Sequence, residues 1–365
     1  MRRIAAQYLF TGKAMIPRGV VTLDDTGKVL AVEQLAETET CSTEFYNGIL
    51  SPGFVNAHCH LELSHFRGAT LPQQGLTHFV NALKDWHKHT MSNGQSMRAA
   101  MKQADEDMLS EGIVAVGDIC NTNHSFSLKT KSKIFYHSFV EAVGLDEELA
   151  QEKIAETEEV WKDALRMGLP ASITPHALYS MSPSLLDYAF DAANNSGILS
   201  IHYKEGRNES HEGSWHFCER LNRNTRLLLI HNTFISPADV ETVNYATGKA
   251  VWVLCPRSNQ YVNGSLPPVD LLYYKGQRIA IGTDSLASNY WLSILDELKV
   301  LSYYFAQIPL EVLLKWATIG GATALNKTDE FGLIIPGRRP GLILIEGVDF
   351  FNMKLLSSAE VKRIV

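Results

Sequence analysis

Eight short apolar runs alternate along the chain with segments long enough to form helices. The runs are rich in Val, Ile and Phe, and most are continuous rather than alternating, as expected for strands buried on both faces. They cover residues 49–58, 113–119, 133–144, 169–177, 198–205, 226–232, 250–259 and 278–285. Helix-length stretches occupy 94–110, 147–167, 184–196, 236–246 and 290–306. A strand followed by a helix, repeated eight times, predicts an α/β fold of the (β/α)8 or TIM barrel type.

The two ends of the chain do not follow this alternation. Residues 1–50 have hairpin character around Asp25–Gly27, and the stretch "GLILIEGVDF" near the other end alternates apolar and polar positions. Such patterns are typical of β-strands. We therefore predict that residues 1–50 and 326–365 form a small composite β-domain beside a barrel of residues 51–325.

Composition narrows the class of protein. The 365 residues are 45% hydrophobic and 20% charged, with a formal net charge of −7 and no block of five like charges. This balance disfavours nucleic acid as a partner. No apolar run has the length of a membrane span, and the N-terminal segment lacks the form of a secretory signal. The expected partner is a small-molecule substrate, and a homodimer is left open.

Cysteine usage points to a reducing compartment. The chain has five scattered cysteines and no CxxC motif. A disulfide framework needs paired cysteines at regular spacing, which this pattern does not offer. We therefore predict a cytoplasmic protein.

Polar side chains gather where the predicted strands end. In a barrel enzyme, these C-terminal strand ends carry the chemistry. A single histidine at such a position is more often structural than a ligand, but here several occur together. The polar residues at or near the strand ends are His58, His60, Asp118, Glu141, His176, His202, Glu205, His231, Ser258, Asn259 and Asp284.

The first strand offers two imidazoles to one ion. Residues i and i+2 of a strand face the same side, so His58 and His60 point together and Cys59 points away. With His202 from the fifth strand and Asp284 from the eighth, they make a divalent metal site with room for water. Three imidazoles and a carboxylate suit Zn²⁺, with Fe²⁺ as the alternative.

The motifs resemble the amidohydrolase superfamily, in its cytosine-deaminase-like and chlorohydrolase-like branch. The resemblance extends over essentially the whole chain and is greatest to deaminases of amino-purines and related nucleosides. It rests on "PGFVNAHCHLELS", "TPHALYSMS", "HYKEGRNE", "LLLIHN", "LCPRSNQY" and "GTDSLASNYWLSILDEL". One departure is Gly341, where relatives often have aspartate.

The resemblance implies roles for these residues. His58, His60, His202 and Asp284 would hold one ion per chain, since the fourth strand lacks the lysine that bridges two metals in some relatives. His231 would contact the attacking water or the metal, and Glu205 would be the proton shuttle. Asp284 would accept the proton of the water. The reaction implied is hydrolytic deamination of an amino-substituted heteroaromatic ring with release of ammonia.

Substrate recognition is less constrained by the sequence. His176, Glu62, Arg257, Ser258 and Asn259 lie near the predicted rim and are candidates for binding the rest of the substrate. Aromatic residues in the segments after the first and eighth strands could line a pocket for a flat base; they are Phe79, Trp86, Tyr290 and Trp291. We predict a purine nucleoside-like substrate over free cytosine.

Two other functions remain open at this point. A triazine-type chlorohydrolase or a cyclic-amide hydrolase would use much of the same site. Measuring whether ammonia or chloride is released would distinguish a deaminase from a chlorohydrolase. A catalytically inactive binding or scaffold homologue is the second alternative. Such a homologue would be expected to lack metal ligands, whereas every expected ligand is present here.

Overall fold

The structure is a computed structural model that describes residues 1–36, 42–90, 94–207, 209 and 215–365. The chain divides into two compact units. The first comprises Met1–Asn56, Glu106–Ala115 and Ser293–Val365, and the second comprises Ala57–Asp105 and Val116–Leu292. Both contain helices and strands, which confirms the α/β class.

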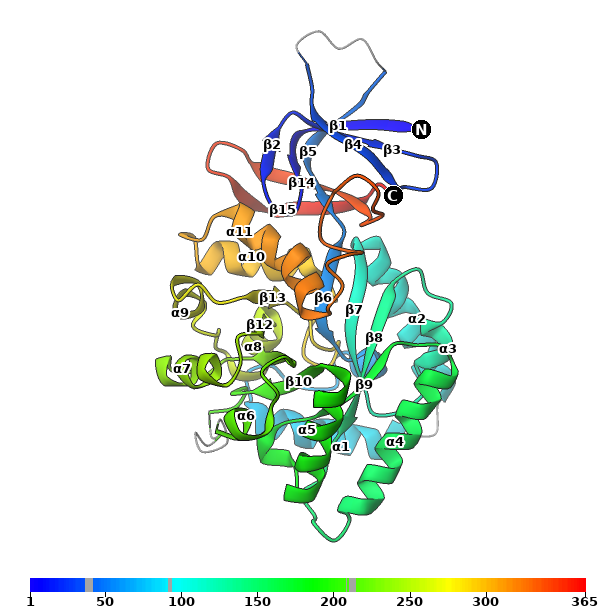
Figure 1. Ribbon diagram of the computed structural model, residues 1–365, viewed down its shortest axis with the longest axis vertical. Coiled ribbons are helices and arrows are strands. Elements are labelled where there is room, and N and C mark those ends of the chain that lie inside the picture. The colour runs from blue at the N-terminus through cyan, green and yellow to red at the C-terminus, as the bar shows by residue number, and fades with distance from the viewer. Residues whose placement is uncertain (37–41, 91–93, 208, 210–214) are drawn as a thin grey trace. The chain divides into compact units, whose positions relative to one another are not determined.

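A seven-stranded sheet built from both ends of the chain forms the first unit's β structure (Figure 1). The strand order is β15-β14-β5-β1-β3-β4, and β2 pairs with β1. The strands are β1 (Arg2–Phe10), β2 (Met15–Pro17), β3 (Gly19–Leu23), β4 (Val29–Gln34), β5 (Glu44–Pro52), β14 (Leu342–Asp349) and β15 (Lys354–Arg363). β1 and β5 run parallel, while β14 pairs antiparallel with both β5 and β15.

Apolar side chains explain why the two chain ends meet in this sheet. Ile4, Leu9, Val21, Leu50 and Leu344 are buried in one cluster that spans four strands. Burying them removes apolar surface from water, which is the main favourable term in folding. The separate β-domain with the boundaries given above stays a prediction.

Helices of the first unit follow the last strand of the second. They are α10 (Ile294–Tyr304), α11 (Leu310–Lys315) and α12 (Gly321–Ala324), with a π-helical turn at Trp316–Gly320 between the last two. Ser293 caps α10 by accepting a hydrogen bond from the Asp296 amide, and its hydroxyl donates to Glu111. A serine cap satisfies one of the free amides at a helix start.

The second set of strands forms two four-stranded sheets, in the orders β6-β7-β8-β9 and β10-β11-β12-β13. The strands are β6 (Phe54–Cys59), β7 (Ile113–Cys120), β8 (Phe135–Ala142), β9 (Ala171–Pro175), β10 (Ile198–Tyr203), β11 (Arg226–His231), β12 (Ala250–Leu254) and β13 (Ile279–Ile281). β8 pairs parallel with β9, and β10 to β13 pair parallel throughout.

Isolated backbone bridges join the outer strands of these two sheets. Ala177 pairs with His202 beyond the end of β9, and Cys59 pairs with Asp284 beyond the end of β13. The His58 carbonyl accepts hydrogen bonds from the amides of Thr283 and Asp284, at 3.0 and 3.1 Å. Both bridges lie at residues that the sequence assigns to the site.

Helices connect the strands of the second set; α4 packs along β8 and β9, and α5 packs along β9 and β10 (Figure 1). The helices are α1 (Leu76–Thr90), α2 (Gly94–Ser110), α3 (Phe126–Lys129), α4 (Ala150–Arg166), α5 (Pro183–Ser196), α6 (Trp215–Arg220), α7 (Pro237–Ala246), α8 (Pro256–Asn263) and α9 (Val269–Tyr274). Single 3-10 turns occupy Leu61–Phe66 and Leu178–Ser180. Among the described helices, none combines the length and apolar character needed to cross a bilayer.

Two predicted strands end differently from the sequence pattern. The run 49–58 is divided at Gly53, where β5 has ended and β6 begins. The run 250–259 stops at Leu254, and Pro256 then opens α8. Proline suits the first turn of a helix because its missing amide is not needed there. Ser258 and Asn259 therefore lie in a helix rather than on a strand.

Candidate active site

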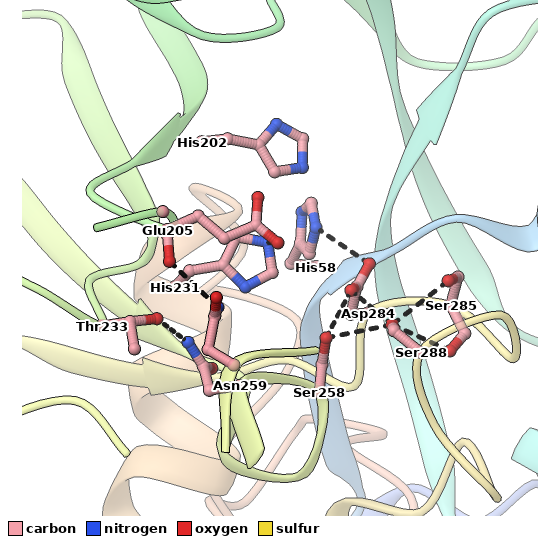
Figure 2. Close-up of polar contacts among 12 residues, drawn as sticks. His58, His202, Glu205, His231, Thr233, Ser258, Asn259, Asp284, Ser285 and Ser288 are labelled. Carbon is pink, nitrogen blue, oxygen red and sulfur yellow. Dashed lines mark hydrogen bonds and ion pairs between the residues drawn. The ribbon is translucent and has the colours of Figure 1, made fainter. Parts of the chain in front are cut away.

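Four imidazoles and one carboxylate meet where β6, β10 and β11 end and just beyond β13. Figure 2 shows His58, His202, His231 and Asp284 of this set. Asp284 Oδ1 lies 3.7 Å from His58 Nε2 and 3.5 Å from His60 Nε2. His60 Nε2 lies 3.3 Å from His202 Nε2. The rings of His202 and His231 are stacked with centroids 5.3 Å apart. All five side chains are buried or nearly so.

These residues form two overlapping groups of atoms that could hold a metal ion. His58, His202 and His231 make one group, and His58, His60 and Asp284 make the other. Within each group, the ligand atoms lie within 4.8 Å of one another. From the sequence, His231 could contact either the metal or the attacking water. Its ring nitrogen lies among the atoms that could bind an ion.

The backbone at two of these residues is unusual. His231 has φ of 73° and Asp284 has φ of 57°, both in the left-handed region. Residues other than glycine are uncommon there because the β-carbon clashes with the backbone. Such conformations gather at functional sites, where surrounding contacts hold them. Here they turn the side chains at the ends of β11 and β13 toward the histidine cluster.

Two hydroxyls hold the Asp284 carboxylate. Ser258 and Ser288 each donate to Asp284 Oδ2 at 2.6 Å, which leaves Oδ1 facing His58 and His60 (Figure 2). Burial by itself would raise the pKa of Asp284, but hydrogen bonding to His58, ahead of the proximity of His60 and His231, lowers this pKa well below its usual value. The carboxylate is therefore ionised at neutral pH.

Burial disfavours the charged form of three of these imidazoles. Burial, followed by the proximity of His58, lowers the pKa of His60 to about 3. Burial also lowers the pKa of His231 to about 3 and that of His202 well below its ordinary value. Neutral imidazole nitrogens and an ionised carboxylate are the forms that bind divalent cations. The donor set thus fits a zinc or iron ion.

Contacts at the second ring nitrogen of His202, Nδ1, fix the orientation of this side chain. Its Nδ1 lies 3.0 Å from the His176 carbonyl oxygen and 3.7 Å from Glu141 Oε1. Glu141 in turn accepts a hydrogen bond from the Asn121 side chain at 2.9 Å. A metal-binding histidine usually donates its second ring nitrogen to such an oxygen, which fixes the tautomer. The arrangement leaves His202 Nε2 directed at the cluster.

Glu205 lies at the edge of this cluster (Figure 2). Its Oε1 is 3.7 Å from His231 Nε2, and the side chain is buried. Burial, together with the negative charges of Asp284 and Glu209, raises the pKa of Glu205 well above its usual value. A raised pKa favours the protonated form of a carboxyl group, which is the form that a general acid requires.

Glu209 supports the turn that carries Glu205, a role that the sequence did not indicate. Its two carboxylate oxygens accept hydrogen bonds from the amides of Lys204 and Gly206, each at 2.8 Å. Lys204 has φ of 51°, so this turn needs outside support. A glutamate that reads as a helix-surface residue in the sequence instead lies outside any described helix and is half-buried.

The sequence-predicted substrate residues have partners within the protein. Ser258 donates to Asp284 as described above. Glu62 is buried and accepts hydrogen bonds from the Thr122 amide and hydroxyl at 3.1 and 2.9 Å. Arg257 donates to the Asn289 side chain, the side-chain NH2 of Asn259 donates to the Thr233 hydroxyl, and His176 Nδ1 lies 2.7 Å from the Ser180 hydroxyl. A role in binding substrate stays a prediction for all five.

A separate pocket of about 540 Å³ adjoins the turn of Glu205. Its surface is about equally polar and apolar, and its lining comprises Gln73, Gln74, Gly75, Leu76, Thr77, Tyr179, Gly206, Arg207, Glu209 and Asn263. None of the predicted substrate residues belongs to this set. Of the aromatic residues expected to line a pocket, Tyr290 and Trp291 are 59% and 54% exposed and, like Phe79, are absent from the lining. The Trp86 side chain lies outside the described part of the structure.

The chain belongs to the amidohydrolase family, whose model matches residues 49–363. This membership makes the protein a hydrolase that acts on carbon–nitrogen bonds. Among curated relatives, the 5-methylthioadenosine/S-adenosylhomocysteine deaminase of Desulforudis audaxviator is 27% identical over 369 residues, covering 92% of this chain and 81% of the relative.

Solved structures with the same fold come from proteins with different reactions. Helicobacter pylori aminofutalosine deaminase in complex with methylthio-coformycin aligns with a TM-score of 0.77 and 22% identity, over 94% of this chain and 92% of that one. Atrazine chlorohydrolase TrzN from Arthrobacter aurescens TC1, complexed with zinc, aligns with a TM-score of 0.78 and 16% identity, over 97% of this chain and 90% of that one. At these identities the likeness shows the fold alone.

Proposed function

We propose that this protein is a metal-dependent hydrolytic deaminase of an amino-substituted heteroaromatic ring, with a purine nucleoside-like substrate. One observation carries the proposal: two carboxyl groups lie against the histidine cluster, Glu205 at 3.7 Å from His231 and Asp284 at 3.7 and 3.5 Å from His58 and His60. Deamination by water needs both a proton acceptor and a proton donor within reach of one carbon atom. The deaminases among the sequence relatives support the same reaction.

His58, His60, His202 and Asp284 would hold one divalent ion, with Zn²⁺ favoured over Fe²⁺. When bound, such an ion lowers the pKa of a coordinated water to about 7 and so supplies a nucleophile at neutral pH. His231 is within reach of the same position and would orient the attacking water.

The chain's own residues would move the protons. Asp284 would accept a proton from the attacking water, since it is ionised and its Oδ1 faces the histidine cluster. Glu205 would donate its proton to the ring nitrogen next to the attacked carbon, which makes that carbon more electrophilic. Ser258 and Ser288 would keep Asp284 in place during this transfer.

The pocket beside Glu205 would receive the part of the substrate remote from the ring. Its volume of about 540 Å³ falls within the range of roughly 300–1,000 Å³ typical of sites that enclose drug-sized ligands. Its amide and hydroxyl groups would offer hydrogen bonds to a hydroxylated sugar. This favours a nucleoside over a free base.

The same proposal includes the architecture that holds the site. We infer that β6 to β13 close into one eight-stranded barrel, because bridges link β9 to β10 and β13 to β6 at His202 and Asp284. Closure of this kind would bring all the strand ends to one rim, as in other TIM barrels. The β-rich chain ends, 1–50 and 326–365, would form the accompanying small domain.

A substrate panel tests the function. Zinc-loaded protein should release ammonia from adenosine, methylthioadenosine, S-adenosylhomocysteine or aminofutalosine with higher kcat/KM than from guanine or cytosine, because remote contacts add binding energy in the transition state. Chloride release from a chlorotriazine, measured in parallel, would instead favour a chlorohydrolase. No turnover of any amino-heterocycle by metal-loaded protein would support an inactive homologue.

A change in the pocket tests where the rest of the nucleoside binds. Thr77→Val preserves shape and removes one hydroxyl from the lining. Losing a single hydrogen bond of about 0.5–1.5 kcal/mol should raise KM for the best nucleoside by roughly 2- to 10-fold, with little change for a free base. Thr328→Val, at an exposed threonine outside the pocket, is the control. Equal effects of Thr77→Val on both substrates would contradict this placement.

A further inference from the structure

A fully buried lysine pairs with a carboxylate that contacts the backbone just after β6. Lys129, the last residue of α3, has a completely enclosed side chain. Its ammonium group is 2.6 Å from Asp118 Oδ2, 2.9 Å from Cys120 Sγ and 3.0 Å from Ser138 Oγ. An ammonium group has three N–H donors, so these three partners account for all of them. The ring of Tyr136 lies 5.4 Å from the same nitrogen.

The partner carboxylate of Lys129 reaches the backbone beside a proposed metal ligand. Asp118 uses its second oxygen, Oδ1, to accept a hydrogen bond from the Leu61 amide at 2.7 Å. That amide belongs to the same rigid peptide plane as the His60 carbonyl. The His60 carbonyl oxygen accepts a hydrogen bond from the Leu63 amide at 3.1 Å. Both ends of the peptide are therefore held, which fixes the ψ angle of His60, 82° in this structure.

This support matters because His60 lies just beyond the end of β6. Its backbone is not held by strand pairing in the way that His58 is, whose carbonyl accepts two amides. A second contact between the same segments reinforces the Asp118 contact. Glu62 accepts hydrogen bonds from the amides of Asn121 and Thr122, in the loop between β7 and α3.

The positive charge of Lys129 lets Asp118 accept the Leu61 hydrogen bond as a buried carboxylate. A buried carboxylate without a counter-charge is strongly disfavoured and becomes protonated instead. A protonated Asp118 would have one oxygen turned into a donor and would accept less strongly from the Leu61 amide. Burial by itself would lower the pKa of Lys129, but Asp118 raises it above its ordinary value, so the ammonium group is charged at neutral pH.

We infer that Lys129 is a positioning residue for the metal centre, acting through Asp118 and the His60–Leu61 peptide to direct His60 Nε2 at the ion. This inference rests on the proposed metal site. Loss of partners beyond the ligands commonly costs 10- to 100-fold in metal affinity. An alternative role would be purely structural, with the pair only joining α3 to β7.

Zinc affinity of the purified full chain, measured by competition with a chromophoric chelator, separates the two roles. Lys129→Met and Asp118→Asn should each weaken zinc binding by about 10- to 100-fold. Both changes disrupt one connection. The zinc affinity of the double variant should therefore equal that of whichever single variant binds zinc less tightly. The visible spectrum of the cobalt-substituted single variants should also differ from that of the wild type, since it reports ligand geometry.

A matched control loses stability without touching this connection. Tyr136→Phe keeps the ring beside Lys129 and removes a buried hydrogen bond to Asp105. It should lower the melting temperature of the metal-free chain and leave zinc affinity and the cobalt spectrum unchanged. If Lys129→Met does not yield folded protein, Lys129→Gln, which retains a donor without the charge, serves in the same measurements.

His60→Ala distinguishes failure of this inference from failure of the metal site. Wild-type zinc affinity in His60→Ala would overturn the metal assignment itself. Lost affinity in His60→Ala with wild-type affinity and spectrum in the Lys129 variant would overturn only the positioning role. A double variant whose loss equals the product of the two single losses would also overturn it, because Lys129 and Asp118 would then act independently.

Discussion

Replacing Glu205 by glutamine is expected to lower kcat by a factor of several hundred or more while the protein retains its metal ion. Glutamine keeps the size of the side chain but has no acidic proton to give to a ring nitrogen. A positioned proton donor contributes roughly 10²- to 10⁴-fold to a rate, so its loss should appear mainly in kcat. Steady-state kinetics and elemental analysis of the same preparation measure the two quantities.

The position of Glu205 makes this outcome specific. Its carboxyl lies 3.7 Å from His231 but belongs to neither group of potential metal-binding atoms. Its raised pKa favours the protonated form, whereas a ligand carboxylate must be ionised. Glu219→Gln, at an exposed glutamate of α6, is the control and should leave kcat unchanged. Loss of the ion from Glu205→Gln would make Glu205 a ligand and refute the proton-donor role.

The strand ends were predictable because their pattern is local. Period-two geometry put His58 and His60 on one side of a strand, and the structure places both beside Asp284 Oδ1. His202 and His231 follow the same logic, since His231 is the last residue of β11 and His202 the last but one of β10. Local patterns are informative here because buried parallel strands need uninterrupted apolar sequence.

The strand boundaries depended on contacts that a local pattern does not contain. At Gly53, a β-carbon would lie 2.3 Å from Val114 Cγ1, so close packing requires glycine at the break between β5 and β6. At Gly282, a β-carbon would lie 2.8 Å from His58 Cβ. Glycine there lets the chain beyond β13 approach β6 closely enough for Asp284 to reach the histidines.

The residues that support the site were not predicted, because their roles also depend on contacts that a local sequence pattern does not contain. Lys129 and Asp118 are eleven residues apart, and neither has a sequence signature that links it to His60. Glu209 has the appearance of a surface residue until its bonds to the Lys204 and Gly206 amides are seen. Buried polar groups must find partners, but the sequence does not say which partners they find.

Removing Asp284 is expected to have the largest effect on the site. Asp284→Ala takes away the only carboxylate in the two groups of potential metal-binding atoms that contain His58, and His60→Ala takes away one imidazole. Loss of partners beyond the ligands already costs about 10- to 100-fold in metal affinity, so loss of a ligand should cost more. Each variant should therefore contain little metal as purified and show almost no deamination.

Asp284→Asn separates the charge of this residue from its shape. The amide can still accept from Ser258 and Ser288, but it cannot neutralise an ion or take a proton from water. Added zinc should restore part of its metal content and very little of its kcat, because proton acceptance depends on the ionised carboxylate. Full metal occupancy in both Asp284→Ala and His60→Ala, measured by elemental analysis, would show that the ion is held elsewhere.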